Sequence, residues 1–189
     1  FAAPALAGAS TPPSHDVVRQ ALASIRKHLG MEIAWVSRFD GDTSVFIGVD
    51  APGLEDRIKP GDSIPLDLVY CRHILAGRLP AVMPDTADFE LARSTPITSM
   101  VPVGSNMSVP ICRKDGSVIG MFCCQSPAPN KSLNERDVQV MKVFADIAAK
   151  QIERDLDAEK AIAEKRGRLS GLIAERQFGF VFQPIWDFH

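Results

Sequence analysis

The sequence predicts an α/β (α+β) fold, in which an antiparallel sheet of about five or six strands is flanked by helices and followed by a long C-terminal helix. Asp-Gly pairs at 40–41 and 115–116 each separate two runs rich in β-branched and aromatic residues. This is a strong hairpin signal, because glycine reaches positive φ without steric cost. Apolar residues recur at helical spacing over 16–29 and from 132 onwards, which predicts helices near both ends. Hairpins combined with flanking helices indicate a layered domain.

The first element predicted is a helix capped by Ser14 or Asp16, with Gly30 just past its end, where a left-handed C-cap is expected. Strands over 32–39 and 43–49 follow, and the polar stretch 50–63 is predicted to be a loop. The buried stripe of the first helix is predicted to consist of Val17, Val18, Leu22, Ile25 and Leu29.

The middle of the chain predicts short elements. Residues 66–77 have helical spacing, 80–85 read as an edge strand because proline cannot donate to a ladder, 86–93 as a short helix and 94–104 as a loop. The hairpin over 105–124 follows. Its second strand is apolar in both alternate registers, so we expect a central strand covered on both faces, with Gly120 marking the close approach of another backbone or a ligand.

A long helix is predicted after this hairpin, because Ser132 and Glu135 resemble a capping box. A helix of ~30 residues extends ~45 Å, longer than the domain is wide, so we expect it to leave the globule and serve dimerisation and signal transmission. Its core-facing stripe is predicted to be Val138, Met141, Phe144, Ala145, Ala148 and Ile152. Its later apolar positions form only a weak coiled-coil seam at Leu156, Ile162, Leu169 and Ile173.

The order of SVPI at 108–111, DGxVIGMFC at 115–123 and a Ser/Asn-initiated helix resembles the closing half of a GAF domain, the small-molecule-sensing module of signalling proteins. The resemblance covers roughly residues 15–155. We therefore divide the chain into a disordered lead-in at 1–14, a GAF sensory domain at 15–155, a helical linker at 156–174 and the start of a further domain at 175–189.

That further segment, FGFVFQPIWDF at 178–188, resembles the opening strand of an EAL domain, the cyclic di-GMP phosphodiesterase barrel. In that family the Glu-Ala-Leu tripeptide and the metal-binding carboxylates lie downstream of this strand, and they do not occur in these 189 residues. We therefore expect no enzyme activity from this chain, and we assign it no catalytic residue and no metal ligand.

Composition narrows the function classes. Hydrophobic content of 46% and charged content of 23% are typical of a globular domain, and a net charge of −2 gives no basic excess for nucleic acid. No apolar run approaches the ~20 residues of a membrane span, and residues 1–14 do not resemble a secretory signal. Four cysteines, two of them adjacent, favour a reduced, cytoplasmic protein over a disulfide framework.

Cys71 lies two residues before His73, and this proximity suggests thiol chemistry. Phytochrome-like GAF domains attach a bilin through a Cys-His pair, and a related branch reduces methionine sulfoxide. The resemblance places the cysteines for both in the loop at 94–104, which has none here, so we expect no bilin. Cys71 could serve as a redox sensor if the His73 imidazole or a helix terminus lowered its pKa. We expect Cys71, Cys112, Cys123 and Cys124 to be packing residues, and the four scattered histidines predict no metal site.

The resemblance also implies a ligand pocket between one sheet face and the helices and loops that precede the final hairpin. Aromatic residues and methionine with a few polar groups suit a small molecule, although the same residues can equally be packed core. Which sheet face holds the pocket stays open at this point. The implied lining is Trp35, Ser37, Phe39, Tyr70, Cys71, Asp85, Phe89, Ile97, Met107, Val109, Met121 and Cys123.

We therefore expect a regulatory domain that senses an unknown small molecule and controls an EAL-type output through a helical linker. It is expected to form a homodimer through its N- and C-terminal helices and to bind neither nucleic acid nor membrane. Two further hypotheses are a structural dimerisation module without a ligand, and a thiol-based redox sensor or methionine sulfoxide reductase-like enzyme.

Overall fold

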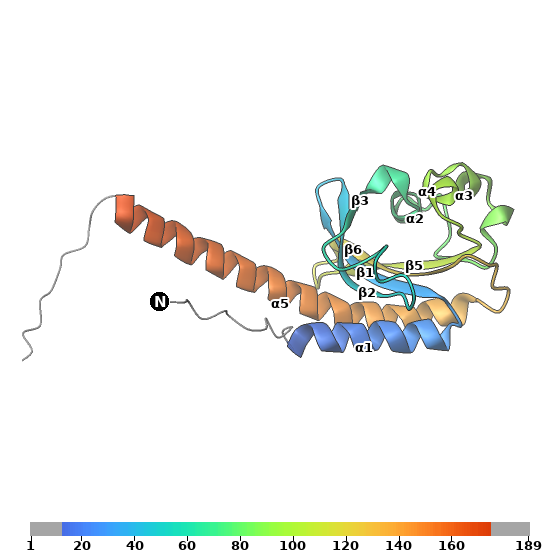
Figure 1. Ribbon diagram of the computed structural model, residues 1–189, viewed down its shortest axis with the longest axis horizontal. Coiled ribbons are helices and arrows are strands. Elements are labelled where there is room, and N and C mark those ends of the chain that lie inside the picture. The colour runs from blue at the N-terminus through green and yellow to red at the C-terminus, as the bar shows by residue number, and fades with distance from the viewer. Residues whose placement is uncertain (1–12, 175–189) are drawn as a thin grey trace, which may run out of the picture. The chain divides into compact units, whose positions relative to one another are not determined.

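The computed structural model describes residues 13–174 (Figure 1). A single sheet with the strand order β3-β2-β1-β6-β5-β4 forms the centre, and every pair of neighbouring strands is antiparallel. This confirms the predicted fold class. The elements are α1 (Pro13–His28), β1 (Ile33–Asp40), β2 (Thr43–Asp50), β3 (Ser63–Pro65), η1 (Leu66–Leu68), α2 (Cys71–Leu75), β4 (Val82–Met83), η2 (Thr86–Asp88), α3 (Glu90–Ser94), α4 (Ile97–Met100), β5 (Ser105–Cys112), β6 (Val118–Ser126) and α5 (Glu135–Ala174).

The sheet separates two helical layers. Helices α1 and α5 lie side by side against one face, and α2, α3 and α4 cover the other (Figure 1). Val17, predicted to be buried, is 54% exposed, so the stripe of α1 is narrower than expected. The buried positions of the two long helices are Val18, Leu22, Ile25 and Leu29 in α1 and Val138, Met141, Ala145, Ala148, Ala149 and Ile152 in α5.

Both long helices begin differently from the prediction. Helix α1 starts at Pro13, so Ser14 and Asp16 lie in its first turn and not at its cap. The cap of α5 is Asn134, whose side-chain oxygen accepts a hydrogen bond from the Arg136 backbone N–H at 3.0 Å. The Asp137 carboxylate in turn accepts a hydrogen bond from the Asn134 backbone N–H at 2.9 Å, which completes a capping box two residues later than predicted.

The middle of the chain is more broken than its apolar spacing predicts. Residues 66–77 form the short turn η1 and the five-residue helix α2, and residues 94–104 contain the helix α4. The break between η1 and α2 falls at Val69, which is extended with φ −123° and ψ 165°. Tyr70 follows and reaches the start of α4, where its hydroxyl lies 2.6 Å from Thr98 Oγ1. Tertiary contacts of this kind outweigh weak local helix propensity.

Strand β6 is central and covered on both faces, as predicted. Gly120 lies where a backbone approaches closely, because a Cβ built on it would be 1.9 Å from the Ser37 carbonyl oxygen of β1. The left-handed C-cap is also confirmed, since Gly30 has φ +60°.

The chain divides into two units, 1–152 and 153–189, and the second includes the later part of α5. Ile162 in that part is 53% exposed. The side chains of Leu169 and Ile173, the predicted lead-in up to residue 12 and the EAL-like segment from 175 lie outside the described residues. No helix within 13–174 is long and apolar enough to cross a membrane.

Candidate functional site

The sheet face beneath α2–α4 carries the predicted aromatic and sulfur residues. Trp35 in β1 lies opposite Cys123 in β6, and Ser37 lies opposite Met121, so these four side chains share one face. Two adjoining clusters of buried residues lie in the layer between this sheet face and α2–α4. The first contains Trp35, Leu66, Cys71, Met121 and Cys123, and the second contains Tyr70, Leu79, Met83, Ala92 and Val103.

Most of the predicted lining therefore comes together. Phe39 packs against the first cluster, and Phe89 and Ile97 pack against the second. Ile74 of α2 contacts both clusters, so the layer is continuous. Trp35 also meets Phe46 of β2, with ring centroids 6.0 Å apart. The sequence analysis left open which sheet face holds the pocket. These residues lie on the face under α2–α4, and we call this region the α2–α4 site.

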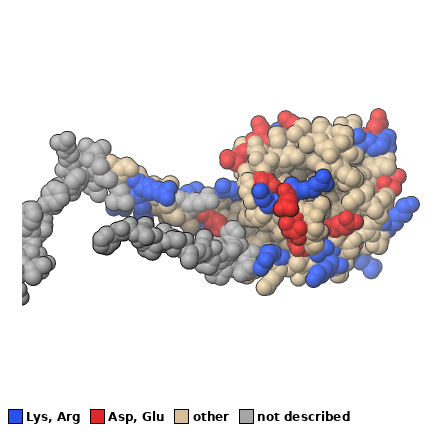
Figure 2. Space-filling model, in the orientation of Figure 1, with Lys and Arg blue, Asp and Glu red and all other residues tan. Residues whose placement is uncertain are grey.

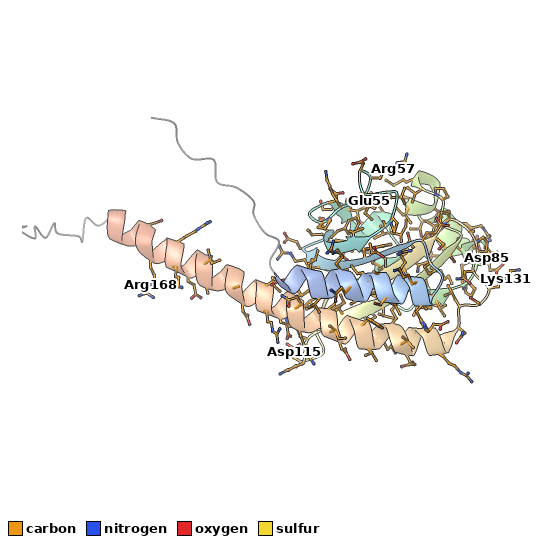
Figure 3. The ribbon with its side chains drawn as sticks, turned by 60° about the horizontal axis from the view of Figure 1, so that its bottom comes forward. Glu55, Arg57, Asp85, Asp115, Lys131 and Arg168 are labelled. Carbon is orange, nitrogen blue, oxygen red and sulfur yellow. The ribbon has the colours of Figure 1, made fainter. Side chains whose placement is uncertain are left out.

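Three predicted residues do not belong to the site. Met107 and Val109 in β5 lie opposite Cys124 and Phe122, which places them on the other sheet face, under α1 and α5. Asp85 uses its carboxylate to accept a hydrogen bond from the Ala87 N–H at 3.0 Å, and so caps η2. Figure 3 places Asp85 at the edge of the domain.

The site also contains a polar network that the sequence analysis did not predict. Asn106 and Ser108 in β5 alternate with the apolar residues and lie opposite Gln125 and Cys123. The Asn106 side-chain oxygen accepts two hydrogen bonds, from Ser108 Oγ at 3.2 Å and from Gln125 Nε2 at 3.0 Å. The alternation of polar and apolar residues in 105–111 was the available signal, because it assigns the polar residues to one face.

Three buried side-chain atoms in the described part of the chain have no hydrogen-bond partner: Ser37 Oγ, His73 Nδ1 and Asn106 Nδ2. Ser37 and Asn106 are fully buried and point from the sheet face toward α2–α4, and His73 belongs to α2 itself. Leaving a buried polar group unpaired costs about 1–3 kcal/mol. Ser37 Oγ can donate or accept a hydrogen bond and Asn106 Nδ2 can donate one, so the site offers both to a further molecule.

Tyr70 contributes a hydroxyl whose hydrogen bond has a defined direction. Thr98 Oγ1 donates its single proton to the Ala92 carbonyl oxygen at 2.6 Å, so Tyr70 donates to Thr98. Burial raises the pKa of the Tyr70 hydroxyl above its ordinary value of 10.0. Tyr70 is therefore neutral at physiological pH and anchors α4 to α2.

The pKa of His73 is lowered from its ordinary 6.5, first by burial and then by the positive charges of Arg78 and Arg72. Below pH 6.5 the unfolded chain binds a proton at this residue while the folded protein resists it, so the free energy of unfolding falls as the pH drops through this range. We expect His73→Gln to reduce this loss of stability. Urea denaturation of wild type and variant between pH 7.5 and roughly 5 measures it, and identical pH profiles would contradict the assignment.

A separate surface pocket of about 440 Å³ lies where α1 ends and the β6–α5 loop runs past it. Two of its polar side chains are bonded within the protein, because Asn130 Nδ2 donates to the Leu29 carbonyl oxygen at 2.9 Å and Asn130 Oδ1 accepts from Ser132 Oγ at 2.6 Å. These bonds tie the end of α1 to the start of α5. We therefore assign this pocket a structural role and take the α2–α4 site as the candidate.

Neither the surface charge nor a metal-binding group distinguishes the site. On the face that Figure 2 shows, acidic and basic side chains are intermixed and neither sign forms a large continuous area. Among the side chains that the structure describes, no three His, Cys, Asp or Glu residues are grouped so that they could hold a metal ion. The buried polar residues in the described part of the chain are limited to serine, threonine and asparagine. The α2–α4 site therefore suits a largely neutral organic molecule.

Comparison with known proteins places this architecture in a family. Residues 13–152 match the sequence profile described as GAF domain. Among curated proteins no relative matches the chain. Solved structures with the same fold include the chromophore-binding domain of an unusual bacteriophytochrome from R. palustris, with 19% identity and a TM-score of 0.59. The match covers 79% of this chain and 58% of that one, less than two thirds of the relative.

Two further structures resemble the chain over most of their length. The GAF domain of an Acinetobacter phosphoenolpyruvate-protein phosphotransferase has 13% identity and a TM-score of 0.61, covering 77% of this chain and 85% of that one. Residues 122 to 287 of a methyl-accepting chemotaxis protein have 23% identity and a TM-score of 0.59, covering 76% and 91%. At identities this low, the structural similarities show a shared fold alone.

Proposed function

Because the chain belongs to the GAF domain family, we propose that it is the sensory domain of a signalling protein and that it binds a small organic molecule in the α2–α4 site. The observation that carries this proposal is the set of unpaired buried atoms on Ser37, His73 and Asn106. A ligand that hydrogen-bonds to them removes the cost of leaving them unpaired. The aromatic and sulfur side chains of the first cluster supply the apolar contacts that such a ligand needs.

The variant Ser37→Ala tests this proposal. The hydroxyl has no partner within the protein, so its removal is expected to change the free energy of unfolding of ligand-free protein by less than about 0.5 kcal/mol. Loss of one hydrogen bond to the ligand is expected to weaken binding roughly 10-fold. Native mass spectrometry of protein as purified measures the fraction that carries an added mass lost on denaturation.

Ser126→Ala is the matched control, since this buried serine lies on the opposite sheet face and accepts a hydrogen bond from the Glu32 N–H at 2.9 Å. Its loss is expected to lower the free energy of unfolding by about 1 kcal/mol without changing ligand occupancy. Equal occupancy in both variants, or wild-type protein that carries no added mass, would contradict the proposal.

We further propose that the domain acts on an output domain through α5, and that this output is of the EAL type. The support is the EAL-like segment at 178–188, which directly follows the helix. Ligand binding can shift an output only by its difference in affinity between two arrangements of the helices. The proposal assigns no catalytic step to the chain itself.

Homodimerisation is part of the proposal. Val140, Val143 and Ile147 in α5 are 37%, 59% and 41% exposed, and their helical spacing places them in one stripe, which we call the outer stripe. Lys142, Asp146 and Lys150 are exposed near it and alternate in sign, which suits a symmetric partner. A second copy of the chain is the proposed occupant of this stripe. A dimerisation module without a ligand remains the second candidate, favoured by this stripe alone.

A further inference from the structure

The four cysteines of the chain are free thiols in different surroundings. Cys71, Cys123 and Cys124 are buried, and Cys112 is half-buried. Cys123 and Cys124 are neighbours in β6, so their side chains point to opposite sheet faces. Cys124 faces α1, and burial raises the pKa of its thiol, whereas Cys123 faces α2. Cys71 and Cys123 are therefore the two thiols that share one compartment.

These two thiols lie in one buried cluster, although they are about 50 positions apart in the sequence. Cys71 is the first residue of α2, and both residues belong to the first cluster together with Trp35 and Met121. Burial raises the pKa of the Cys123 thiol, and the neighbouring Cys71 thiol raises it further. The thiol pair thus joins the helical cover to the central strand.

We propose that Cys71 and Cys123 form a redox modification site, at which a hydroperoxide converts the two thiols into a reversible disulfide. In the first step the Cys71 sulfur attacks one peroxide oxygen and becomes a sulfenic acid, while the other oxygen leaves and takes up the thiol proton as water. In the second step the Cys123 sulfur displaces the sulfenic hydroxyl, which also leaves as water. Two thiols and one hydrogen peroxide give one disulfide and two water molecules.

The order of the two steps follows from the positions of the residues. Cys71 lies in the outer, helical layer and is 5% exposed, whereas Cys123 lies in the middle of the sheet and is 1% exposed. An oxidant entering from the α2 side therefore meets Cys71 first. Cys123 then acts as the resolving thiol, because it lies in the same buried cluster as Cys71.

The disulfide would fix α2 to β6 across the α2–α4 site. Its meaning as a signal rests on the sensory function proposed above, whereas formation of the bond does not. Closing a long loop in the unfolded chain raises the midpoint temperature of unfolding, so the oxidised domain is expected to melt several degrees higher than the reduced one. Oxidation would also exclude ligands that need α2 to move.

Hydrogen peroxide treatment of the full chain, followed by intact mass measurement and peptide mapping without reduction, tests the inference. We expect a monomer mass about 2 Da lower, the mass of two hydrogen atoms, and a single cross-linked peptide pair containing Cys71 and Cys123. Dithiothreitol is expected to restore the original mass. Cys71→Ala and Cys123→Ala are expected to abolish the cross-link, while the matched controls Cys112→Ala and Cys124→Ala keep it.

Other products would overturn the inference. These are unchanged thiols, sulfinic or sulfonic acid at Cys71 without a cross-link, a bond between two chains, or a cross-link that involves Cys112 or Cys124. Mapping wild-type protein needs no variant to fold, so the test stands even if an alanine variant is unstable. A cross-link in protein that never carries an added small molecule would support this site and count against the proposed ligand, which separates the two proposals.

Discussion

Replacing Gly120 with alanine is expected to lower the free energy of unfolding by about 3–5 kcal/mol, or to prevent folding. The added Cβ would lie 1.9 Å from the Ser37 carbonyl oxygen and 2.9 Å from its carbonyl carbon. Both atoms belong to the backbone of β1, which is paired with β6 along most of its length and has little freedom to move. The clash therefore has to be relieved by separating the two central strands of the sheet.

Urea denaturation followed by circular dichroism measures this loss. Gly167→Ala in α5 is the matched control, because nothing lies within 4 Å of a Cβ added there. A glycine-to-alanine change in a helix interior is expected to be neutral or to stabilise the helix by up to about 1 kcal/mol. A loss below about 1 kcal/mol in Gly120→Ala would show that the two strands are not held this closely.

Replacing Val143 with aspartate is expected to convert the proposed homodimer into monomers. Val143 is the most exposed member of the outer stripe, and a two-fold interface would bury it from both copies. Two uncompensated carboxylates in one interface are expected to weaken the dimer roughly 1,000-fold. Sedimentation velocity over a range of protein concentrations measures the change.

Val118→Asp serves as its control. This valine at the start of β6 is 40% exposed and lies outside the helices, so the same charge is expected to leave the oligomeric state unchanged. Circular dichroism checks that both variants are folded. A wild-type chain that sediments as a monomer at micromolar concentration, or a Val143→Asp variant that stays a dimer, would remove the outer stripe as the dimer contact.

The centre of the fold could be predicted from the sequence because its signals are local. Asp-Gly turns define the two hairpins, and a strand that is apolar in both registers has to be covered on both faces, as β6 is. Gly120 was identified for the same reason, since glycine inside a buried strand indicates a close approach. These features depend on residues that are near one another in the chain.

The membership of the site could be predicted only in part. The family resemblance assigned Met107 and Val109 to it, yet their register in β5 places them under α1 and α5. The same alternation places Asn106 and Ser108 in the site, although the predicted lining, which was mostly apolar, did not include them. A shift of one residue exchanges the two faces of a strand, so composition alone cannot choose between them.

The helix starts show a different limit. Ser132 and Glu135 have the spacing of a capping box, but Asn134 and Asp137 have the same spacing and form the box that the fold uses. Ser132 instead donates its hydroxyl proton to Asn130 Oδ1, in the loop that contacts the end of α1. The choice between two adequate caps therefore depends on a tertiary contact.

A crystal structure of the protein as purified, without added ligand, tests the central claim most directly. The account predicts electron density for an organic molecule between the sheet and α2–α4, within hydrogen-bonding distance of Ser37 Oγ or Asn106 Nδ2 and in contact with Trp35. Such density would also identify the ligand class. Ordered water alone on Ser37, His73 and Asn106, with the apolar side chains filling the remaining space, would contradict the sensory proposal and leave a dimerisation module.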